Sequence, residues 1–147
     1  QEGLQDNWNN LVKTRGYYAI VEGHLKEKHG TIKSYLKKNA QNMMYSSKKP
    51  GDGQLAITHY DVLMESDDYS LLDVHIDSGR KNQIRVHLGD LGHNVIGDDK
   101  YGNPSNPIKR LGLHAYELTL VHPFTGKTLK FTAPIPKEFK ILFPNFN

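Results

Sequence analysis

The chain has 147 residues, of which 37% are hydrophobic and 24% charged, so its length and composition fit one globular domain spanning residues 1–147 rather than a disordered segment. Its net charge of +3 is compatible with nucleic acid but does not require it. No apolar run is long enough for a membrane span and no secretory signal opens the chain. The absence of cysteine excludes disulfides and cysteine-based zinc sites, and fits the reducing cytoplasm.

The elements expected along the chain begin with a strand. Residues 1–10 are polar and rich in amides, which predicts an irregular start, whereas Tyr17 to Val21 is aromatic and β-branched, which predicts a strand. From Lys26 to Gly53 the chain is basic and polar and finishes in Pro50-Gly51-Asp52-Gly53, which predicts a long surface excursion closed by a turn. Its lysines are candidates for nucleic-acid phosphate contacts, although a run of charge is also simply a solvated face.

Two extended stretches follow, Leu55–Met64 and Tyr69–Asp77, and together they predict an antiparallel hairpin. In the second stretch apolar and polar residues alternate, so its two faces differ in character. The apolar face carries Leu72, Val74 and Ile76, and the polar face carries Asp73, His75 and Asp77.

Beyond residue 80 the apolar spacing changes from two to three and four. Ile84, Leu88 and Leu91 recur at that spacing and Gly92 follows, which predicts a short amphipathic helix of about three turns. The remaining chain predicts a second hairpin and a final short helix; these are Leu111–His122 with Lys127–Ala133, and Pro136–Leu142. Hairpins with few helices indicate an α+β fold with a mostly antiparallel mixed sheet.

The densest polar group lies at the junction of strand and helix, from Gly79 to His87. Backbone N–H groups and cationic side chains can face one anionic ligand there. Arg85 lies beside the apolar helical face, so it must find a carboxylate or a phosphate, because an unpaired buried cation is prohibitively costly. One alternative is a purely structural salt bridge from Arg85 to Asp73 or Asp77.

Other catalytic patterns are missing. The eight histidines include no His-Glu-x-x-His and no His-x-His spacing, so we expect no bound metal. There is no glycine-rich phosphate loop and no nucleophile elbow, and we expect no cofactor. Asp98 and Asp99 are adjacent carboxylates, but they lie in a turn bounded by Gly97 and Gly102, where Asp is a routine turn former.

Several stretches together resemble one family. Ser78-Gly79-Arg80-Lys81-Asn82-Gln83-Ile84-Arg85-Val86-His87, followed by Ile96-Gly97-Asp98 and Tyr101-Gly102, is similar to the second signature of the RluA-type RNA pseudouridine synthases. Tyr17-Tyr18-Ala19-Ile20-Val21-Glu22-Gly23 resembles the strand that precedes that signature. Leu113-His114-Ala115 and Ala133-Pro134-Ile135-Pro136 resemble the end of the family's catalytic domain.

The resemblance implies an enzyme that isomerises uridine in rRNA or tRNA to pseudouridine, without cofactor or metal. It implies two catalytic residues in this chain, Tyr17 packing against the flipped base and Arg85 pairing with the nucleophilic aspartate. It also implies that Leu113 lines the pocket below the base. The remaining candidates for substrate binding are Arg80, Lys81, Gln83 and His87.

Two departures from the family pattern matter. Asn82 stands where the family usually has histidine, a change that both side chains' donor and acceptor capacity makes tolerable. The nucleophilic aspartate of the family's Gly-Arg-Leu-Asp segment has no counterpart before Tyr17, since Asp6 lies in a different context. We therefore expect the C-terminal part of a catalytic domain, inactive alone, in which Arg85 holds a buffer anion, a water cluster or a substitute carboxylate.

Two other readings stay open. One is a non-catalytic RNA-binding module on the same scaffold, which predicts tight RNA binding by the isolated chain. The other is a structural or interaction domain, which predicts that Arg80 and Arg85 only form salt bridges. The synthase and the binding module share RNA as the partner. None of the three readings involves a membrane.

Overall fold

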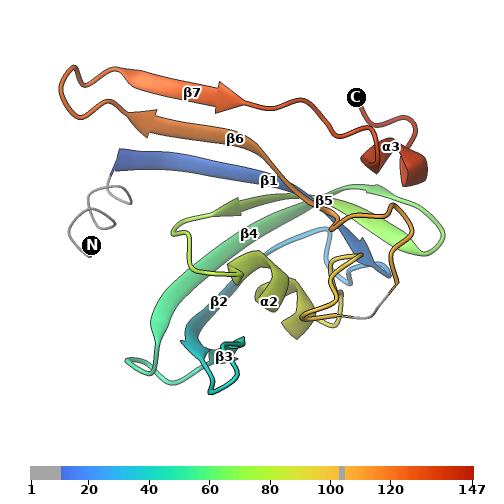
Figure 1. Cartoon of the computed structure of the whole chain (residues 1–147), viewed down its shortest axis with the longest axis horizontal. Helices are drawn as coiled ribbons and strands as arrows, with labels where there is room; N and C mark the ends of the chain where they lie inside the picture. The colour runs from blue at the N-terminus through green and yellow to red at the C-terminus, as the bar shows by residue number, and fades with distance from the viewer. Residues whose placement is uncertain (1–10, 103–104) are drawn as a thin grey trace.

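One seven-stranded sheet organises the molecule. The computed structural model describes residues 11–102 and 105–147, so the predicted irregular start at residues 1–10 lies outside the described part. The strands lie in the order β3-β2-β4-β5-β1-β6-β7, and every pair of neighbours is antiparallel (Figure 1). The bounds are β1 Val12–Glu22, β2 His29–Lys38, β3 Met44–Ser47, β4 Gln54–Glu65, β5 Tyr69–Ile76, β6 Leu113–Val121 and β7 Thr128–Thr132. The predicted α+β class with a mostly antiparallel sheet is confirmed.

Strand β1 is the centre of the arrangement. It pairs with β5 on one side, Tyr17 opposite Val74, and with β6 on the other, Tyr17 opposite Ala115. Its alternating residues serve two cores because successive side chains of a strand point to opposite faces. Ala19 and Val21 belong to one core, and Ile20 between them belongs to the other.

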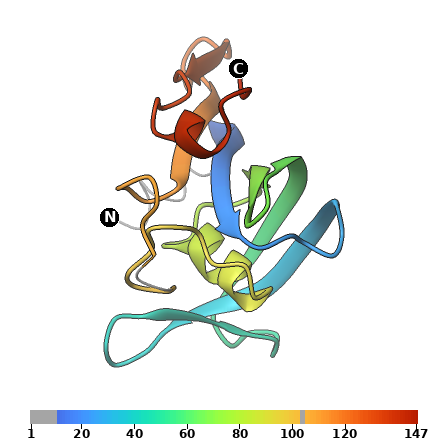
Figure 2. The ribbon, with the colours of Figure 1, turned by 90° about the vertical axis from the view of Figure 1, so that its right-hand side faces the viewer.

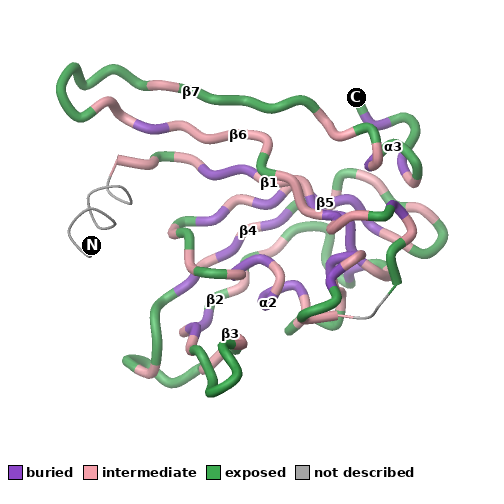
Figure 3. The backbone as a smooth tube through the Cα atoms, viewed as in Figure 1, coloured by how far each residue is buried: buried purple, intermediate pink, exposed green. Residues whose placement is uncertain are grey.

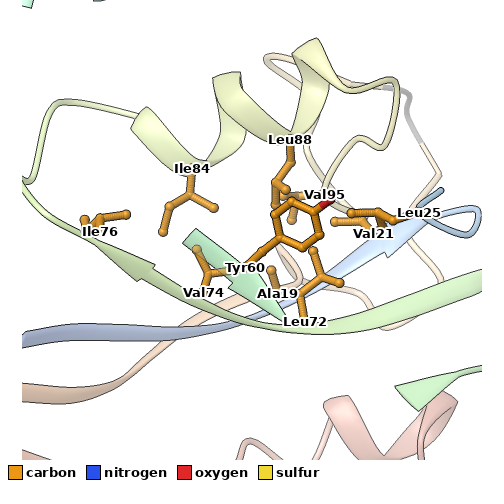
Figure 4. Packing of buried hydrophobic residues seen from close by; sticks show 10 residues of the cluster. All are labelled: Ala19, Val21, Leu25, Tyr60, Leu72, Val74, Ile76, Ile84, Leu88 and Val95. Carbon is orange, nitrogen blue, oxygen red and sulfur yellow. The ribbon is translucent and has the colours of Figure 1, made fainter. Parts of the chain in front are cut away.

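Two short helices cover the two faces of this sheet. Helix α2, Gln83–Asp90, packs Ile84 and Leu88 onto the face that carries Ala19 (Figure 4). Helix α3, Phe139–Leu142, packs Phe139 against the opposite core, and the two helices lie well apart along the twisted sheet (Figure 2). No helix in the described ranges is long and apolar enough to cross a membrane.

The prediction for the basic stretch was wrong. Instead of one surface excursion, Lys26–Gly53 holds β2 and β3, which form an edge of the sheet. On β2 the side chains of Lys33 and Lys38 are exposed, whereas Ser34 and Leu36 are buried. Figure 3 shows buried stretches within β2 and exposed chain in the loops beside β3. The predicted turn at its end is present, with Gly51 at a φ of 81°.

The other predicted elements are confirmed with shifted boundaries. Both hairpins form, as β4 with β5 and β6 with β7. Helix α2 has 8 residues, just over two turns, and ends before Leu91, which is 42% exposed and not part of the apolar face. Gly92 follows with a φ of 85°, as expected for the residue after a helix. Helix α3 begins at Phe139, after the predicted start at Pro136.

Candidate active site

A cavity of about 280 Å³ opens where β1, the start of β6 and helix α2 meet. Strand β1 contributes Tyr17, because its odd-numbered side chains face α2. The chain leaving β5 and entering α2 forms one wall, and the chain entering β6 forms the other. The residues around the cavity are Tyr17, Ile76, Gly79, Arg80, Asn82, Gln83, Ile84, Arg85, Leu111 and Leu113.

Arg85 is one of two arginines around this cavity, with Arg80, and a carboxylate holds it. Its Nε lies 2.9 Å from Oδ2 of Asp98 and its Nη2 lies 2.7 Å from Oδ1, so the pair is bidentate. Its Nη1 donates to Oδ1 of Asn82 over 3.1 Å, and its Cζ lies 5.1 Å from the centre of the Tyr101 ring. The guanidinium is therefore fixed in orientation, and pairing with Asp98 raises the pKa of Arg85 further.

The surroundings of Asp98 favour its pairing with Arg85. Its side chain is 1% exposed, and Oδ1 also accepts the backbone N–H groups of Lys100 and Tyr101. Burial acts to raise the pKa of Asp98, but Arg85 and the backbone donors outweigh it and hold that pKa below its ordinary value. Asp98 thus serves as a turn former, as predicted, and also as a buried ion-pair partner.

Asn82 connects the arginine to the loop. It has a φ of 57° and a ψ of 22°, a left-handed conformation that asparagine tolerates better than most residues. Its Oδ1 accepts from Arg85, and its Nδ2 donates to the Tyr101 hydroxyl over 3.1 Å. The residue that departs from the family pattern is therefore compatible with both its backbone geometry and its bridging role.

Most predicted site residues come together here. Tyr17, Arg85 and Leu113 line the one cavity although they come from β1, α2 and β6. Arg80 and Gln83 lie on its wall, and the Arg80 Nε donates to the backbone oxygen of Leu55 over 3.0 Å.

Two predicted substrate contacts lie elsewhere. Lys81 is exposed and is not among the residues around the cavity. His87 lies on α2 and is 0% exposed, and its ring nitrogens face Ser34 and Thr58 on the strands rather than the cavity. In this structure neither side chain reaches the cavity that Arg85 lines.

The alternative partners suggested for Arg85 are wrong. Asp73 accepts from the Tyr116 hydroxyl over 2.8 Å, and Asp77 pairs with His59 over 3.1 Å. Both carboxylates point away from α2, because Val74 and Ile76 on the same strand point toward it. Arg85 instead pairs with the carboxylate of Asp98, and a carboxylate is one of the three kinds of partner expected for it. The only sequence signal for Asp98 was its Gly-Asp context.

Metal ligation has no support within residues 11–102 and 105–147. No group of three histidine, cysteine or acidic side chains there is placed to hold an ion.

The basic stretch Lys26–Gly53 contains an internal ion pair. Its Lys37 Nζ pairs with Oδ1 of Asp52 over 2.5 Å.

Comparisons with known proteins find members of one family. The family described as RNA pseudouridylate synthase matches residues 1–90. The chain is 35% identical to the uncharacterized RNA pseudouridine synthase YjbO of Bacillus subtilis, covering 95% of this chain and 48% of that protein. It is 33% identical to ribosomal large subunit pseudouridine synthase D of Zymomonas mobilis, over 96% of this chain and 47% of that protein.

Solved structures agree with the sequence comparison. Human RNA pseudouridylate synthase domain containing 1 superposes with a TM-score of 0.74 and 26% identity, covering 91% of this chain and 58% of that one. The chain spans about half the length of the curated relatives it matches.

Proposed function

Because the chain belongs to the RNA pseudouridylate synthase family, we propose that it is the C-terminal part of a catalytic domain that converts uridine in RNA to pseudouridine. One observation carries the proposal: Tyr17, Arg85 and Leu113, brought from three separate elements, line a single cavity. An aromatic ring, a fixed cation and an apolar side chain are what a flipped pyrimidine and an attacking carboxylate would require.

The proposed reaction exchanges one glycosidic bond for another. The N1–C1′ bond of uridine breaks, the base turns, and a C5–C1′ bond forms while C5 loses its proton and N1 gains one. Tyr17 packs against the base and Leu113 lines the pocket below it. The nucleophilic aspartate has no counterpart in this sequence, so the chain alone is expected to be inactive.

Arg85 has donors left for that aspartate. A guanidinium carries five N–H groups, and three of them are used among the described residues, two on Asp98 and one on Asn82. The remaining two can bind a second carboxylate. A cation within about 4–6 Å favours the ionised form of a carboxyl group, which keeps it nucleophilic.

RNA is the proposed substrate, bound in part through its phosphates. Arg80 on the cavity wall and Lys81 nearby are the candidate phosphate contacts, and binding should weaken with salt. A ribosomal or transfer RNA and a cytoplasmic location are parts of the same proposal. The name of the Zymomonas relative supports the ribosomal choice.

The test is tritium release from RNA labelled at uridine C5. The chain should be silent alone and should release tritium when joined to its native upstream segment. In the joined protein, Arg85→Lys should bring release close to background because lysine cannot make the bidentate pair. Tyr17→Leu should do the same, whereas Tyr35→Leu on the outer face of β2 should not.

Each outcome has a defined meaning. Release by the chain alone would place the nucleophile among its own aspartates and overturn the assignment. Silence from both proteins, together with tight RNA binding, would instead favour the non-catalytic binding module.

A further inference from the structure

A row of hydrogen-bonded polar side chains joins helix α2 to the strands that it covers, beginning at Gln83 on the cavity wall. Gln83 Nε2 donates to Thr58 Oγ1 over 2.9 Å, and Thr58 Oγ1 lies 2.7 Å from His87 Nδ1. His87 Nε2 lies 2.8 Å from Ser34 Oγ. The row thus ties α2 to β4 and β2 through hydrogen bonds rather than through apolar contact alone.

The row continues to the surface. Ser34 Oγ donates to Ser46 Oγ on β3 over 3.0 Å, and Ser46 Oγ donates to the carboxylate of Asp90 at the end of α2. Both ends of the row therefore lie on α2, and the middle crosses three strands.

The Asp90 end fixes the direction of the hydrogen bonds. A carboxylate can only accept, so the one proton of Ser46 goes to Asp90 and Ser46 accepts the proton of Ser34. Ser34 must therefore accept from His87, which places a proton on Nε2. In a neutral imidazole Nδ1 then carries no proton and accepts from Thr58, which itself accepts from Gln83.

Burial supports this assignment. Thr58 and His87 are 0% exposed and Gln83 is 2% exposed. Burial also lowers the pKa of His87. A protonated His87 would carry a second N–H on Nδ1, and the Thr58 hydroxyl would then have to turn its proton away from the ring, so the row favours the neutral ring.

The inner end of the row reaches the cavity. Gln83 Oε1 accepts the backbone N–H of Arg80 over 3.1 Å, and Gln83 Nε2 also donates to the backbone oxygen of Ile57 over 3.0 Å. We propose that His87 is a positioning residue that acts through Thr58 and Gln83 to hold the wall of the cavity at Arg80. This inference rests on the proposed function in that the cavity receives a uridine.

Thr58 offers the cleanest perturbation because it touches neither the cavity nor the surface. Thr58→Val keeps the shape and removes the hydroxyl, and Thr58→Ser restores it. Ser70→Ala is the matched control: Ser70 is also 0% exposed, and its hydroxyl donates to the backbone oxygen of Gly23 over 2.7 Å, outside the row.

Two readouts on the full chain test the inference. Nitrogen NMR should find His87 as the Nε2–H tautomer. Thr58→Val should shift both the Nδ1 signal of His87 and the backbone amide signal of Arg80. Titration with uridine 5′-monophosphate should give about three- to tenfold weaker binding for Thr58→Val, in line with one lost hydrogen bond. Thr58→Ser should bind like the wild type, and so should Ser70→Ala.

The outcomes separate this inference from the proposed function. Equal weakening by Thr58→Val and Ser70→Ala would be a general loss of stability and would overturn the positioning role. An Nδ1–H tautomer, or an Arg80 amide unmoved by Thr58→Val, would overturn it as well. A wild-type chain that fails to bind the nucleotide counts against the proposed function, and the two NMR signals then still decide the role of His87.

Discussion

Replacing Asp98 by asparagine tests the ion pair that orients Arg85. The substitution keeps an oxygen for the N–H groups of Lys100 and Tyr101, but it leaves a buried cation facing a neutral amide. Removing one partner of a buried pair costs about 3–5 kcal/mol, and Arg85 is 19% exposed, so we expect the lower end, about 3 kcal/mol. With a urea m-value of about 2 kcal/mol per molar, the unfolding midpoint should fall by about 1.5 M.

Asp99→Asn is the control, because Asp99 is the exposed neighbour and should change stability by less than about 0.5 kcal/mol. The pH dependence gives a second check. The pKa of Asp98 is lowered in the folded state, so its contribution is present above the unfolded value and is lost as pH falls through the folded value. The stabilities of wild type and Asp98→Asn should therefore begin to converge as pH falls below about 4. A loss under about 1 kcal/mol at neutral pH, or an equal loss in Asp99→Asn, would refute the reasoning.

Three further predictions concern the elements around the site. Burial lowers the pKa of His87, so its neutral form favours the fold and the free energy of unfolding should fall as pH drops below about 6.5. The pKa of His114 is also lowered, so His114 contributes to the same pH dependence. In urea denaturation at several pH values, His87→Gln should keep only the part of this pH dependence that comes from His114. Asn82→Ala should lower the free energy of unfolding by about 2 kcal/mol in thermal unfolding, because it leaves a strained φ and removes two hydrogen bonds. Asn82→Gly should lower it less, because glycine removes the strain; equal losses for the two variants would contradict this. In urea denaturation, Leu88→Ala should lower the free energy of unfolding by about 2–5 kcal/mol, because Leu88 is fully buried. Leu91→Ala should lower it by less than about 0.5 kcal/mol, because Leu91 is exposed beyond the end of α2; the reverse order would contradict that end.

Local patterns predicted those parts of the fold that depend on neighbours along the chain. The alternation through Leu72, Val74 and Ile76 led correctly to the hairpin of β4 and β5. The same alternation already placed Asp73 on the far face, so it argued against the suggested pairing of that residue with Arg85. That inference was missed, although the signal was present in the sequence.

The strand β2 was missed for a different reason. Its buried positions include Ser34, a polar residue whose place in the core depends on His87, which lies far along the chain on α2. A pattern of polar and charged residues therefore looked like a surface segment. Likewise, the partner of Arg85 could not be identified from spacing, because only the folded loop brings Asp98 back to the helix.

The order of strands has a consequence for how the protein reaches its structure. The hairpin of β4 and β5 is local, but the central strand β1, which ends at Glu22, needs β6, which begins only at Leu113 (Figure 1). Contacts this distant in sequence slow folding, because the intervening loop must close before they form. On a ribosome, one edge of β1 must wait unpaired until Leu113 to Val121 has emerged. The cavity between Tyr17 and Leu113 therefore cannot form before Leu113 has been translated, and no ligand can be received there earlier.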